Sequence, residues 1–500
     1  MAKDMEICLN PLVEQIGKQP KDFTKADIIQ FIENNEIKML NFRYVAGDGR
    51  LKVLNFVISD SDYLEQLLSF GERVDGSSLF SFVETGASDL YVIPRFRSAF
   101  IDPFAELPTL CLMCSYYTKD GKPLEISLEY ILKKAARSFR EVTGMEFQAM
   151  GELEYYVIGE KKDLFMATDQ KGYHEAAPFA KFEDFRTHCM YLIARAGGMI
   201  KYGHSEVGNF TMDDKIYEQN EIEFLVTDVE NAANQLIIAK WIIRKLALEY
   251  GLDVTFSPKI TVGKAGSGMH IHTRIVKDGK NCMVDKNGLS DVARTAIAGY
   301  MQCAPSLTAF GNINPTSYFR LVPHQEAPTT VCWGDRNRSV LVRVPLGWTT
   351  NEDMVANENP LEKQGKKDAS GKQTVEFRCP DGSADVYLLL AGLTVAARSG
   401  FEMQNALEFA KKTYVDVNIF HAEHKDKVKD LDSLPDCCHD SAEMLQKQRE
   451  IYERHGVFTP QIIDGIIKNL QAFNDKGIRA ELSKDPKKML DFVMKYYYCG

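Results

Sequence analysis

The chain has 500 residues, and 60 lysines and arginines against 70 aspartates and glutamates give a formal net charge of −10. Hydrophobic residues make up 45% of the sequence and charged residues 26%, which is typical of folded globular proteins. This composition excludes a disordered chain, collagen and a small disulfide scaffold. It also argues against a nucleic-acid binder, which usually carries a net basic domain or stripe. Length alone suggests about three domains.

Neither a signal peptide nor a membrane segment is expected. The longest apolar stretch, 386–397, is far shorter than the roughly 20 residues that a membrane helix needs, and the N-terminus lacks an apolar segment. The 11 cysteines are odd in number and irregularly spaced, so we expect reduced thiols in the cytoplasm. Cys111 and Cys114 form an isolated C-x-x-C in an apolar run, which favours two buried strand residues over a redox or metal site.

Residues 1–118 predict a small α+β domain. The segment 24–36 has the pattern of a capped amphipathic helix, and two alternating apolar runs around Gly47-Asp48-Gly49 indicate a hairpin. Further strand-like runs lie at 89–94 and 107–117. A polar, turn-rich stretch then separates this domain from the rest of the chain.

Residues 119–500 alternate helical patterns with short strand-like runs and become mostly helical from residue 385. Helices are expected at 127–144, 183–198 and 229–251. In the last of these, we expect one apolar face to include Trp241 and Leu248, and Gly251 to cap the C-terminus. A polar stretch at 355–373 predicts an exposed loop. The aromatic C-terminal tail favours docking on a core or on a partner.

Four short strand-like runs each carry two ionisable residues two positions apart. These pairs are Glu152 and Glu154, Glu221 and Glu223, His270 and His272, and Glu376 and Arg378. Residues i and i+2 of a strand share a face, so each run places both ionisable groups together. One such strand is usually a solvated outer face, but four in one domain predict a polar sheet face that could hold cations. Carboxylates and imidazoles without thiolates suit Mg²⁺ or Mn²⁺ better than a structural zinc.

A group of arginines follows the third pair along the chain. It comprises Arg320, Arg336, Arg338, Arg343 and Arg378. Scattered surface arginines would be the simplest interpretation, but Arg343 interrupts an apolar strand, where an unpaired guanidinium is unfavourable. Arginine binds carboxylates and phosphates through two parallel hydrogen bonds. Together with Mg²⁺, which usually accompanies phosphates, the arginines suggest phosphoryl transfer at a nucleotide site without a Walker A loop.

At these residues the sequence resembles the glutamine synthetase family, closest to the bacterial type I form, over about residues 25–485. Nine segments match family motifs in order: 74–82, 151–157, 171–178, 204–207, 219–224, 266–272, 320–328, 336–345 and 375–381. The resemblance implies an α+β fold. A small N-terminal β-grasp-like domain, 1–118, would precede a catalytic domain, 119–500, whose curved, split-barrel-like antiparallel sheet is backed by helices. It also implies hexameric rings, usually stacked as a dodecamer, in which the N-terminal domain meets a neighbour's catalytic domain.

The resemblance also implies site residues. One metal would be held by Glu154, Glu206 and Glu221, and a second by Glu152, His270 and Glu376. Ammonium would be bound by Asp75, Ser78, Tyr173, Glu206 and Glu326. The amino-acid substrate would contact Gly266 and Arg320. ATP would contact His272, Arg343 and Lys372, with Arg338 and Arg378 at the transferring phosphoryl group.

The implied reaction joins ammonium to the γ-carboxylate of L-glutamate. ATP would phosphorylate the carboxylate to an acyl phosphate, which supplies a good leaving group. Asp75 would deprotonate ammonium, and Glu326 would close the site against water. The expected partners are therefore ATP, L-glutamate, ammonium, two or more Mg²⁺ or Mn²⁺ ions and further copies of the chain, but no nucleic acid or membrane.

Several positions depart from the family pattern. Lys264 and Ala265 replace Asp and Asn beside the amino-acid pocket, and Thr374 replaces an arginine, which Lys372 could compensate. Extra residues separate Glu206 from Glu221, and the segment 427–435 lacks the regulatory tyrosine. Two alternatives therefore stay open: a γ-glutamyl–amine ligase that uses an organic amine, and a non-catalytic structural homologue.

Overall fold

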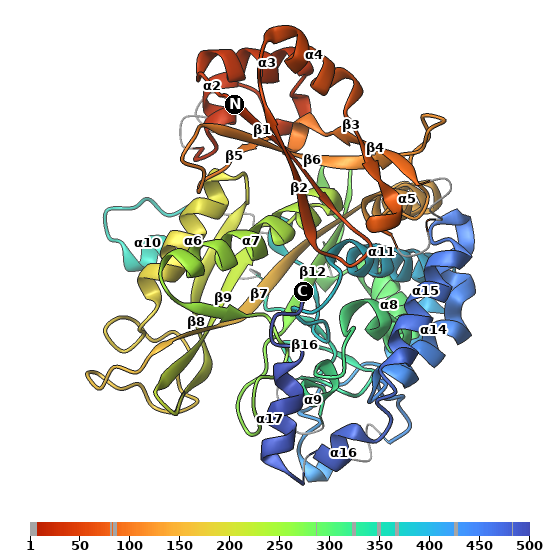
Figure 1. Cartoon of the computed structure of the whole chain (residues 1–500). Helices are drawn as coiled ribbons and strands as arrows, with labels where there is room; N and C mark the ends of the chain where they lie inside the picture. The colour runs from red at the N-terminus through yellow and green to blue at the C-terminus, as the bar shows by residue number, and fades with distance from the viewer. Residues whose placement is uncertain are drawn as a thin grey trace.

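A computed structural model describes residues 8–80, 83, 88–286, 288–322, 327–347, 352–365, 370–424, 429–482 and 484–500. A small N-terminal sheet with its helices lies above a much larger body of strands and helices (Figure 1). The structure confirms the α+β prediction.

The N-terminal sheet has the strand order β2-β1-β6-β4-β3, with β5 beside β6. The strands are β1 Met39–Val45, β2 Leu51–Val57, β3 Glu72–Asp75, β4 Asp89–Pro94, β5 Phe100–Ile101 and β6 Thr109–Tyr117. Helices α2 Pro11–Ile16, α3 Lys25–Asn34 and α4 Ser61–Phe70 accompany it. The predicted first helix begins at Thr24, whose side chain accepts from the N–H of Asp27 while the Asp27 carboxylate accepts from the N–H of Thr24. The predicted hairpin is also confirmed, because β1 pairs antiparallel with β2.

The C-x-x-C cysteines lie on β6, in the interior of the N-terminal sheet. Cys111 and Cys114 are both buried and both reduced. Burial raises the pKa of Cys111 to about 11, so its thiol stays protonated at neutral pH. The prediction of two buried strand residues is confirmed.

The larger sheet has the strand order β16-β17-β18-β12-β7-β9-β8, with β10, β11 and β13 at its margins. Its main strands are β7 Glu146–Glu160, β8 Ile200–Met212, β9 Lys215–Phe224, β12 Met269–Lys277, β16 Trp333–Asp335, β17 Val342–Val344 and β18 Val375–Phe377. The marginal strands are β10 Thr227–Asp228, β11 Asp253–Thr255 and β13 Lys280–Asn281, and β14 Val284–Asp285 pairs with β15 Gly288–Leu289. The extra residues after Glu206 lengthen the β8–β9 hairpin, whose turn contains Asp213 with a positive φ of 55°.

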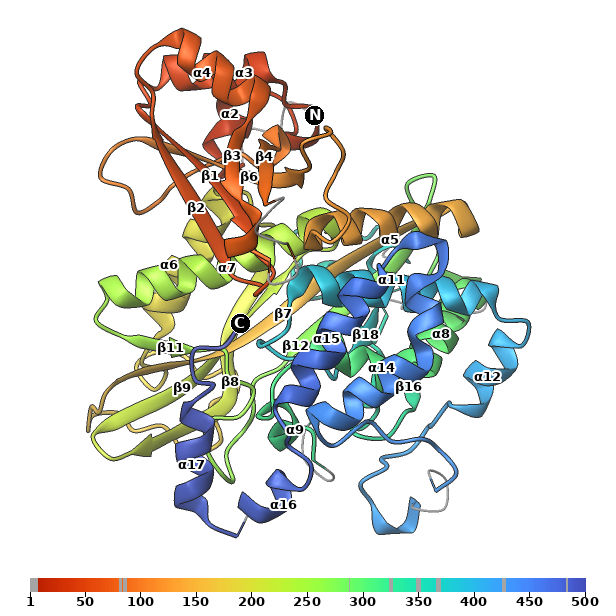
Figure 2. The same cartoon turned by 45° about the vertical axis from the view of Figure 1, so that its right-hand side comes forward.

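Helices make up most of the rest of the larger body. The first group, whose members contact the larger sheet, comprises α5 Leu128–Thr143, α6 Glu183–Arg195, α7 Val229–Glu249 and α8 Asp291–Gly311. The second comprises α9 Ser317–Arg320, α10 Met354–Glu358, α11 Val386–Glu402, α12 Ala406–Lys412, α14 Cys438–Glu453, α15 Pro460–Ala472, α16 Ile478–Leu482 and α17 Pro486–Met494. Helices α5 and α7 pack on β7, and α11 packs between α5 and α8 (Figure 2). Buried residues such as Leu153, Ile271 and Phe377 fill the space between sheet and helices.

Three local predictions need correction. Leu248 is 73% exposed, because the last turn of α7 extends beyond the core. The C-cap residue of α7 is Tyr250, and Gly251 adopts the left-handed conformation just after it. The stretch 355–373 is not all loop, since α10 Met354–Glu358 overlaps its start; residues 366–369 lie outside the described part of the chain.

The C-terminal tail docks on the larger body of the same chain. Tyr497 packs with Tyr156, Phe210 and Ile260, and the hydroxyl of Thr255 donates to the Tyr497 carbonyl. The core of the same chain therefore covers Tyr497, whereas the neighbouring Tyr498 is 61% exposed.

No single helix among the described residues has the length and apolar character to cross a membrane. Helices α11 and α12 pass that test only as a pair bent by 113°, and most of α11 is buried inside the protein.

Candidate active site

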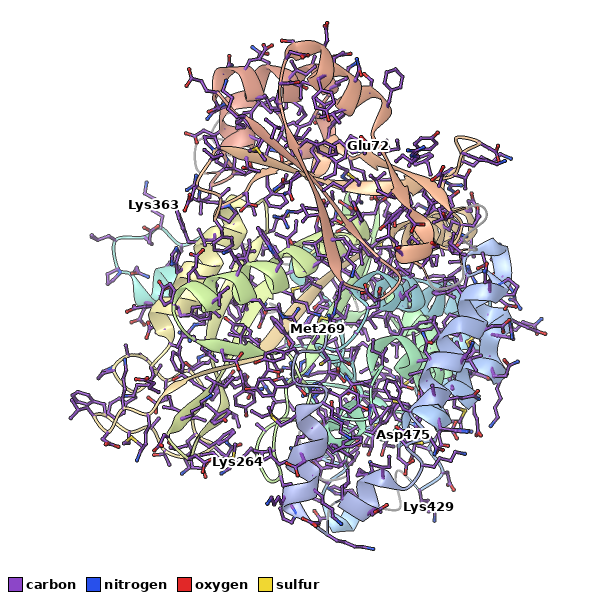
Figure 3. All side chains as sticks on the ribbon, viewed as in Figure 1. Glu72, Lys264, Met269, Lys363, Lys429 and Asp475 are labelled. Carbon is purple, nitrogen blue, oxygen red and sulfur yellow. The ribbon has the colours of Figure 1, made fainter. Side chains whose placement is uncertain are left out.

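The polar face of the larger sheet carries ionisable side chains in cross-strand rows. Directly opposed residues of antiparallel strands have neighbouring side chains on the same face. The two central rows are Glu223–Glu152–His270 and His272–Glu376–Arg343. Met269, labelled near the middle of Figure 3, marks the start of β12, which supplies both histidines. The alternation seen in the sequence thus assembles residues from five strands.

Glu152 bridges the two histidines. Its Oε2 lies 3.0 Å from Nδ1 of His270, and its Oε1 lies 2.7 Å from Nε2 of His272. Burial alone would raise the pKa of Glu152, but the two imidazoles hold it well below its ordinary value. Burial likewise favours neutral His272, yet contact with Glu152 raises the pKa of His272 above its ordinary value. The carboxylate therefore stays ionised in a buried position.

Glu376 is only 2% exposed and is held by two arginines. Its Oε2 accepts from Nη1 of Arg343 at 2.9 Å, and its Oε1 accepts from Nε of Arg378 at 3.0 Å. Burial and Glu152 raise the pKa of Glu376, but Arg378 and the two histidines bring it below its ordinary value. Nε of Arg343 is buried without a hydrogen-bond partner among the described residues. A buried donor of this kind is suited to an anion placed above the sheet.

A second acidic group lies beside these rows. Glu154 and Glu221 are directly opposed on β7 and β9, and Glu206 lies on β8 where three residues bulge between the Ser205 and Asn209 pairs. Bulges re-aim side chains next to functional sites, which accounts for Glu206 joining this group. Burial raises the pKa of Glu221 well above its ordinary value, and the charges of its neighbours Glu152, Glu154, Glu206 and Glu223 raise it further.

The residues present fit divalent cations. Ligand atoms of Glu152, His270 and Glu376 lie within 4.8 Å of one another, a spacing that allows a shared ion. His204, Glu221 and Glu223 form a second group with the same spacing. A buried carboxylate surrounded by like charges, as Glu221 is, needs a cation to remain ionised. Oxygen donors with few imidazoles are the set that Mg²⁺ and Mn²⁺ accept.

Arg320, at the end of α9, lies beside the candidate metal ligands. It is 6% exposed, donates from Nη1 to the Cys379 carbonyl at 2.9 Å, and places Nη2 3.3 Å from Nε2 of His270. The Gly266 segment packs directly on its stem: a Cβ at Gly266 would lie 2.9 Å from Cγ of Arg320 and 2.6 Å from the Pro258 carbonyl oxygen. This contact explains why a residue without a side chain stands there.

Some predicted site residues lie at the margin of the polar face. Tyr173 is 47% exposed and stacks on His174, with its ring 5.4 Å from that of His204. Arg338 is exposed, and its carbonyl accepts from Nη1 of Arg378. Lys372 is exposed just before β18.

Other predicted residues are not brought to this face by the single chain. Asp75 lies at the end of β3 in the upper domain and accepts from the hydroxyls of Ser77 and Ser78 (Figure 1). These hydrogen bonds, led by Ser78, lower the pKa of Asp75. Among the described residues, neither Asp75 nor Ser78 forms a hydrogen bond or ion pair with a residue of the polar face. Glu326 lies outside the described residues.

The departures at Lys264, Ala265 and Thr374 have structural counterparts. Nζ of Lys264 pairs with Asp169 at 2.5 Å, and the N–H of Ala265 donates to Gln170 at 2.7 Å. These contacts tie the glycine-rich segment to the preceding loop. The hydroxyl of Thr374 lies 2.8 Å from Nδ1 of His272 and so helps to orient that ring.

Sequence reasoning gave no role to His204 or Gln219. Nε2 of His204 lies 3.5 Å from Oε1 of Glu221, and burial lowers the pKa of His204, which keeps the ring neutral. Gln219 donates to Oε2 of Glu154 at 3.0 Å. His204 stands two residues before Glu206, so the same i, i+2 criterion would have selected it; nothing local marks Gln219.

Comparison with known proteins agrees with this geometry. Residues 36–119 match the family model "Glutamine synthetase, beta-Grasp domain", and residues 129–475 match "Glutamine synthetase, catalytic domain". A glutamine synthetase of Clostridium saccharobutylicum is 32% identical over 442 residues, which cover 86% of this chain and 91% of the relative. One of Pyrococcus furiosus is 29% identical and covers 93% of this chain and 97% of the relative. The fold is similar to that of Plasmodium falciparum glutamine synthetase, with a TM-score of 0.73 at 19% identity over 91% of this chain and 96% of the other.

Proposed function

We propose that this chain, which belongs to the glutamine synthetase family, ligates ammonium to the γ-carboxylate of L-glutamate at the cost of ATP. Membership of the family establishes a ligase of glutamine synthetase type or a close relative. The observation that carries the finer assignment is the pair of convergent acidic groups bordered by Arg320, Arg343 and Arg378 on one sheet face.

The acidic groups would hold two divalent ions. Glu152, His270 and Glu376 would hold one, and Glu154, Glu206 and Glu221 the other, with His204 and Glu223 beside them. Such ions, when bound, neutralise phosphate charge and stabilise the phosphoryl group during transfer. Mg²⁺ or Mn²⁺ is the ion that we propose for both positions.

Arginines would hold both anionic substrates. Arg320 donates to three backbone carbonyls, and no carboxylate of the described residues forms an ion pair with it, so its charge is suited to the substrate carboxylate. Arg343 and Arg378 are aligned by Glu376, and their remaining N–H groups would contact the phosphates. Arg338, Lys372 and His272 would complete the ATP contacts.

The reaction needs an activated carboxylate. A free carboxylate does not react with amines because its leaving group would be oxide. Phosphoryl transfer from ATP to the γ-carboxylate oxygen gives γ-glutamyl phosphate and ADP. Attack by ammonia on the carbonyl carbon then expels phosphate and gives glutamine.

Asp75 would take the proton from ammonium, and Ser78, Tyr173, Glu206 and Glu326 would complete that pocket. Asp75 and Ser78 lie on the upper domain, away from the polar face of their own chain. A neighbouring copy would therefore have to bring them to the site, which supports hexameric rings and a dodecamer. The 11 reduced cysteines support the cytoplasm as the compartment.

An organic amine is the second candidate acceptor. Lys264 and Ala265 stand where the family pattern has Asp and Asn beside the amino-acid pocket, which could alter the substrate. A structural neighbour titled "GmaS/ADP complex" has a TM-score of 0.70 at 19% identity, which supports the shared fold.

Phosphate release from ATP and L-glutamate, measured with ammonium, methylamine, ethanolamine and putrescine, tests both candidates. We expect turnover with ammonium and a loss of at least about a hundredfold in Glu152→Gln. Turnover only with an organic amine would refute the ammonium assignment and support the second candidate. A folded, assembled protein that turns over none of them would refute both and leave the non-catalytic alternative.

A further inference from the structure

Arg274 is a cationic residue on the polar face to which sequence reasoning gave no role. It follows His270 and His272 on β12 at the same two-residue spacing, so all three side chains share one face. Its Nε donates to Oε1 of Gln148 at 2.8 Å, and its Nη1 donates to the Gly371 carbonyl at 3.1 Å. The guanidinium is thus fixed in orientation by two neutral acceptors.

Arg274 has no acidic partner among the residues that the structure describes. In the part of the chain that the structure describes, no carboxylate forms an ion pair with it, whereas Arg343 and Arg378 both pair with Glu376. The side chain is half-buried, and burial lowers its pKa. A half-buried, preoriented guanidinium without a counter-ion is suited to binding a ligand.

The position of Arg274 along β12 limits which part of a ligand it can reach. An antiparallel strand rises about 3.4 Å per residue, so Arg274 lies roughly 14 Å from His270 along the sheet. Phosphates held by the two acidic groups would begin near His270 and pass His272. Arg274 therefore lies beyond the phosphates, where the nucleoside would follow.

The neighbouring strand shows that Arg274 lies beside the position where the family pattern has an arginine. Thr273 pairs with Val375, so the next row brings Arg274 beside Thr374, the position where the resemblance led us to expect an arginine. Lys372, the residue expected to compensate for that arginine, is adjacent to Gly371, which Arg274 already contacts. Arg274 thus supplies from β12 the guanidinium that β18 lacks.

We propose that Arg274 binds the nucleoside end of ATP, with its planar guanidinium lying against the adenine base. Guanidinium groups stack on aromatic faces, and a neutral base requires no compensating negative charge from the protein. This inference rests on the proposed function, because it assumes that the polar face binds a nucleotide.

Binding measurements with two probes test the inference. Titration calorimetry with Mn²⁺ present would compare ADP, which carries the base, with inorganic pyrophosphate, which does not. We expect Arg274→Ala to weaken ADP binding about tenfold and to leave pyrophosphate binding unchanged within about twofold. Lys277→Ala is the matched control, because Lys277 is exposed on the same strand and points to the other face.

The outcomes separate this inference from the proposed function. A wild-type protein that binds neither probe would refute the nucleotide site itself. A wild-type protein that binds ADP no more tightly than Arg274→Ala does would overturn the role of Arg274 alone. An equal loss of ADP and pyrophosphate would overturn the placement at the base.

A conservative variant tests the stacking geometry. Arg274→Lys keeps the charge but lacks the planar group, so we expect it to bind ADP almost as weakly as Arg274→Ala does. Full recovery by lysine would overturn stacking on the base. Equal melting temperatures of the variants and the wild type, measured without ligand, would show that the affinities compare equally folded proteins.

Discussion

Glu221→Gln is expected to stabilise the protein without divalent ions and to weaken the stabilisation that such ions give. Glu221 is 5% exposed, and four further glutamates act on it electrostatically. Glutamine has nearly the same shape but no charge, so it removes both the repulsion and the need to bind a proton at this position. It also removes one carboxylate ligand from the ion that Glu154, Glu206 and Glu221 would hold.

The size of the effect follows from Coulomb's law. An ionised Glu221 and one carboxylate about 5 Å away repel by roughly 3 kcal/mol at an effective dielectric constant of 20. Because the pKa of Glu221 is raised, the metal-free protein relieves part of this repulsion by binding a proton there, which itself costs stability at neutral pH. The variant also loses the contact of Glu221 with His204 at 3.5 Å, so we expect a net gain of about 2 kcal/mol. In a domain of about 350 residues this gain raises the melting temperature by roughly 2–3 °C. An ion at a hundredfold excess over its Kd stabilises the wild type by about 2.7 kcal/mol, and the variant should receive less.

Scanning calorimetry in EDTA and in MnCl₂ measures both effects. The control is Glu218→Gln on the same strand, because Glu218 accepts from the backbone N–H groups of Lys181 and Phe182, away from the acidic groups. We expect this control to melt below the wild type in both buffers and to keep the full manganese shift. If Glu221→Gln also melts below the wild type in EDTA, the repulsion argument is refuted.

Three further outcomes are expected. Gly266→Ala should raise the KM for L-glutamate about tenfold or more, because the new Cβ would press on Arg320. The KM for ATP should change little, and equal changes in both KM values would contradict this reasoning. The Cys111 thiol should resist alkylation at pH 7.5 in the native protein and react after denaturation, because burial raises its pKa to about 11. Mass spectrometry measures the labelling, and rapid labelling of the native protein would contradict this expectation. Asp75→Asn and Glu376→Gln should each be inactive alone. If each site takes Asp75 from a neighbouring copy, mixed assemblies from co-expression of the two variants should regain roughly a quarter of the activity. No recovery in such assemblies would refute a shared site.

The composition of the polar face could be predicted from the sequence because it depends on local alternation. The two-residue spacing of Glu152 and Glu154, or of His270 and His272, fixes their common face once the segment is a strand. Such spacing needs no knowledge of the rest of the fold. The metal-type residues are therefore identifiable from the amino-acid sequence alone.

The order of the strands could not be predicted in this way. The contact of His270 with Glu152 joins residues 118 positions apart, and nothing within either segment specifies the partner. The bulge that directs Glu206 toward Glu221 is equally invisible, since it appears only as a register shift between β8 and β9. Only the resemblance to a family linked these segments, and it did so without predicting Arg274.

The number of domains stays a prediction, and the larger sheet bears on it. One sheet of strands drawn from residues 146–377 shares a continuous apolar core with the helices of the larger body. A core of this kind cannot be divided without exposing apolar surface, which favours two domains over the three that chain length suggests.

The cross-strand rows have a consequence for how the chain folds. A slip of one residue in β12 would turn His270, His272 and Arg274 into the apolar core and bring Met269 and Ile271 to the surface. Burying three ionisable groups without partners is strongly unfavourable, so the wrong pairing is rejected during folding. The charges suited to substrate binding thus also select the correct alignment of the strands, and a protein that has folded at all has its binding groups on the proper side.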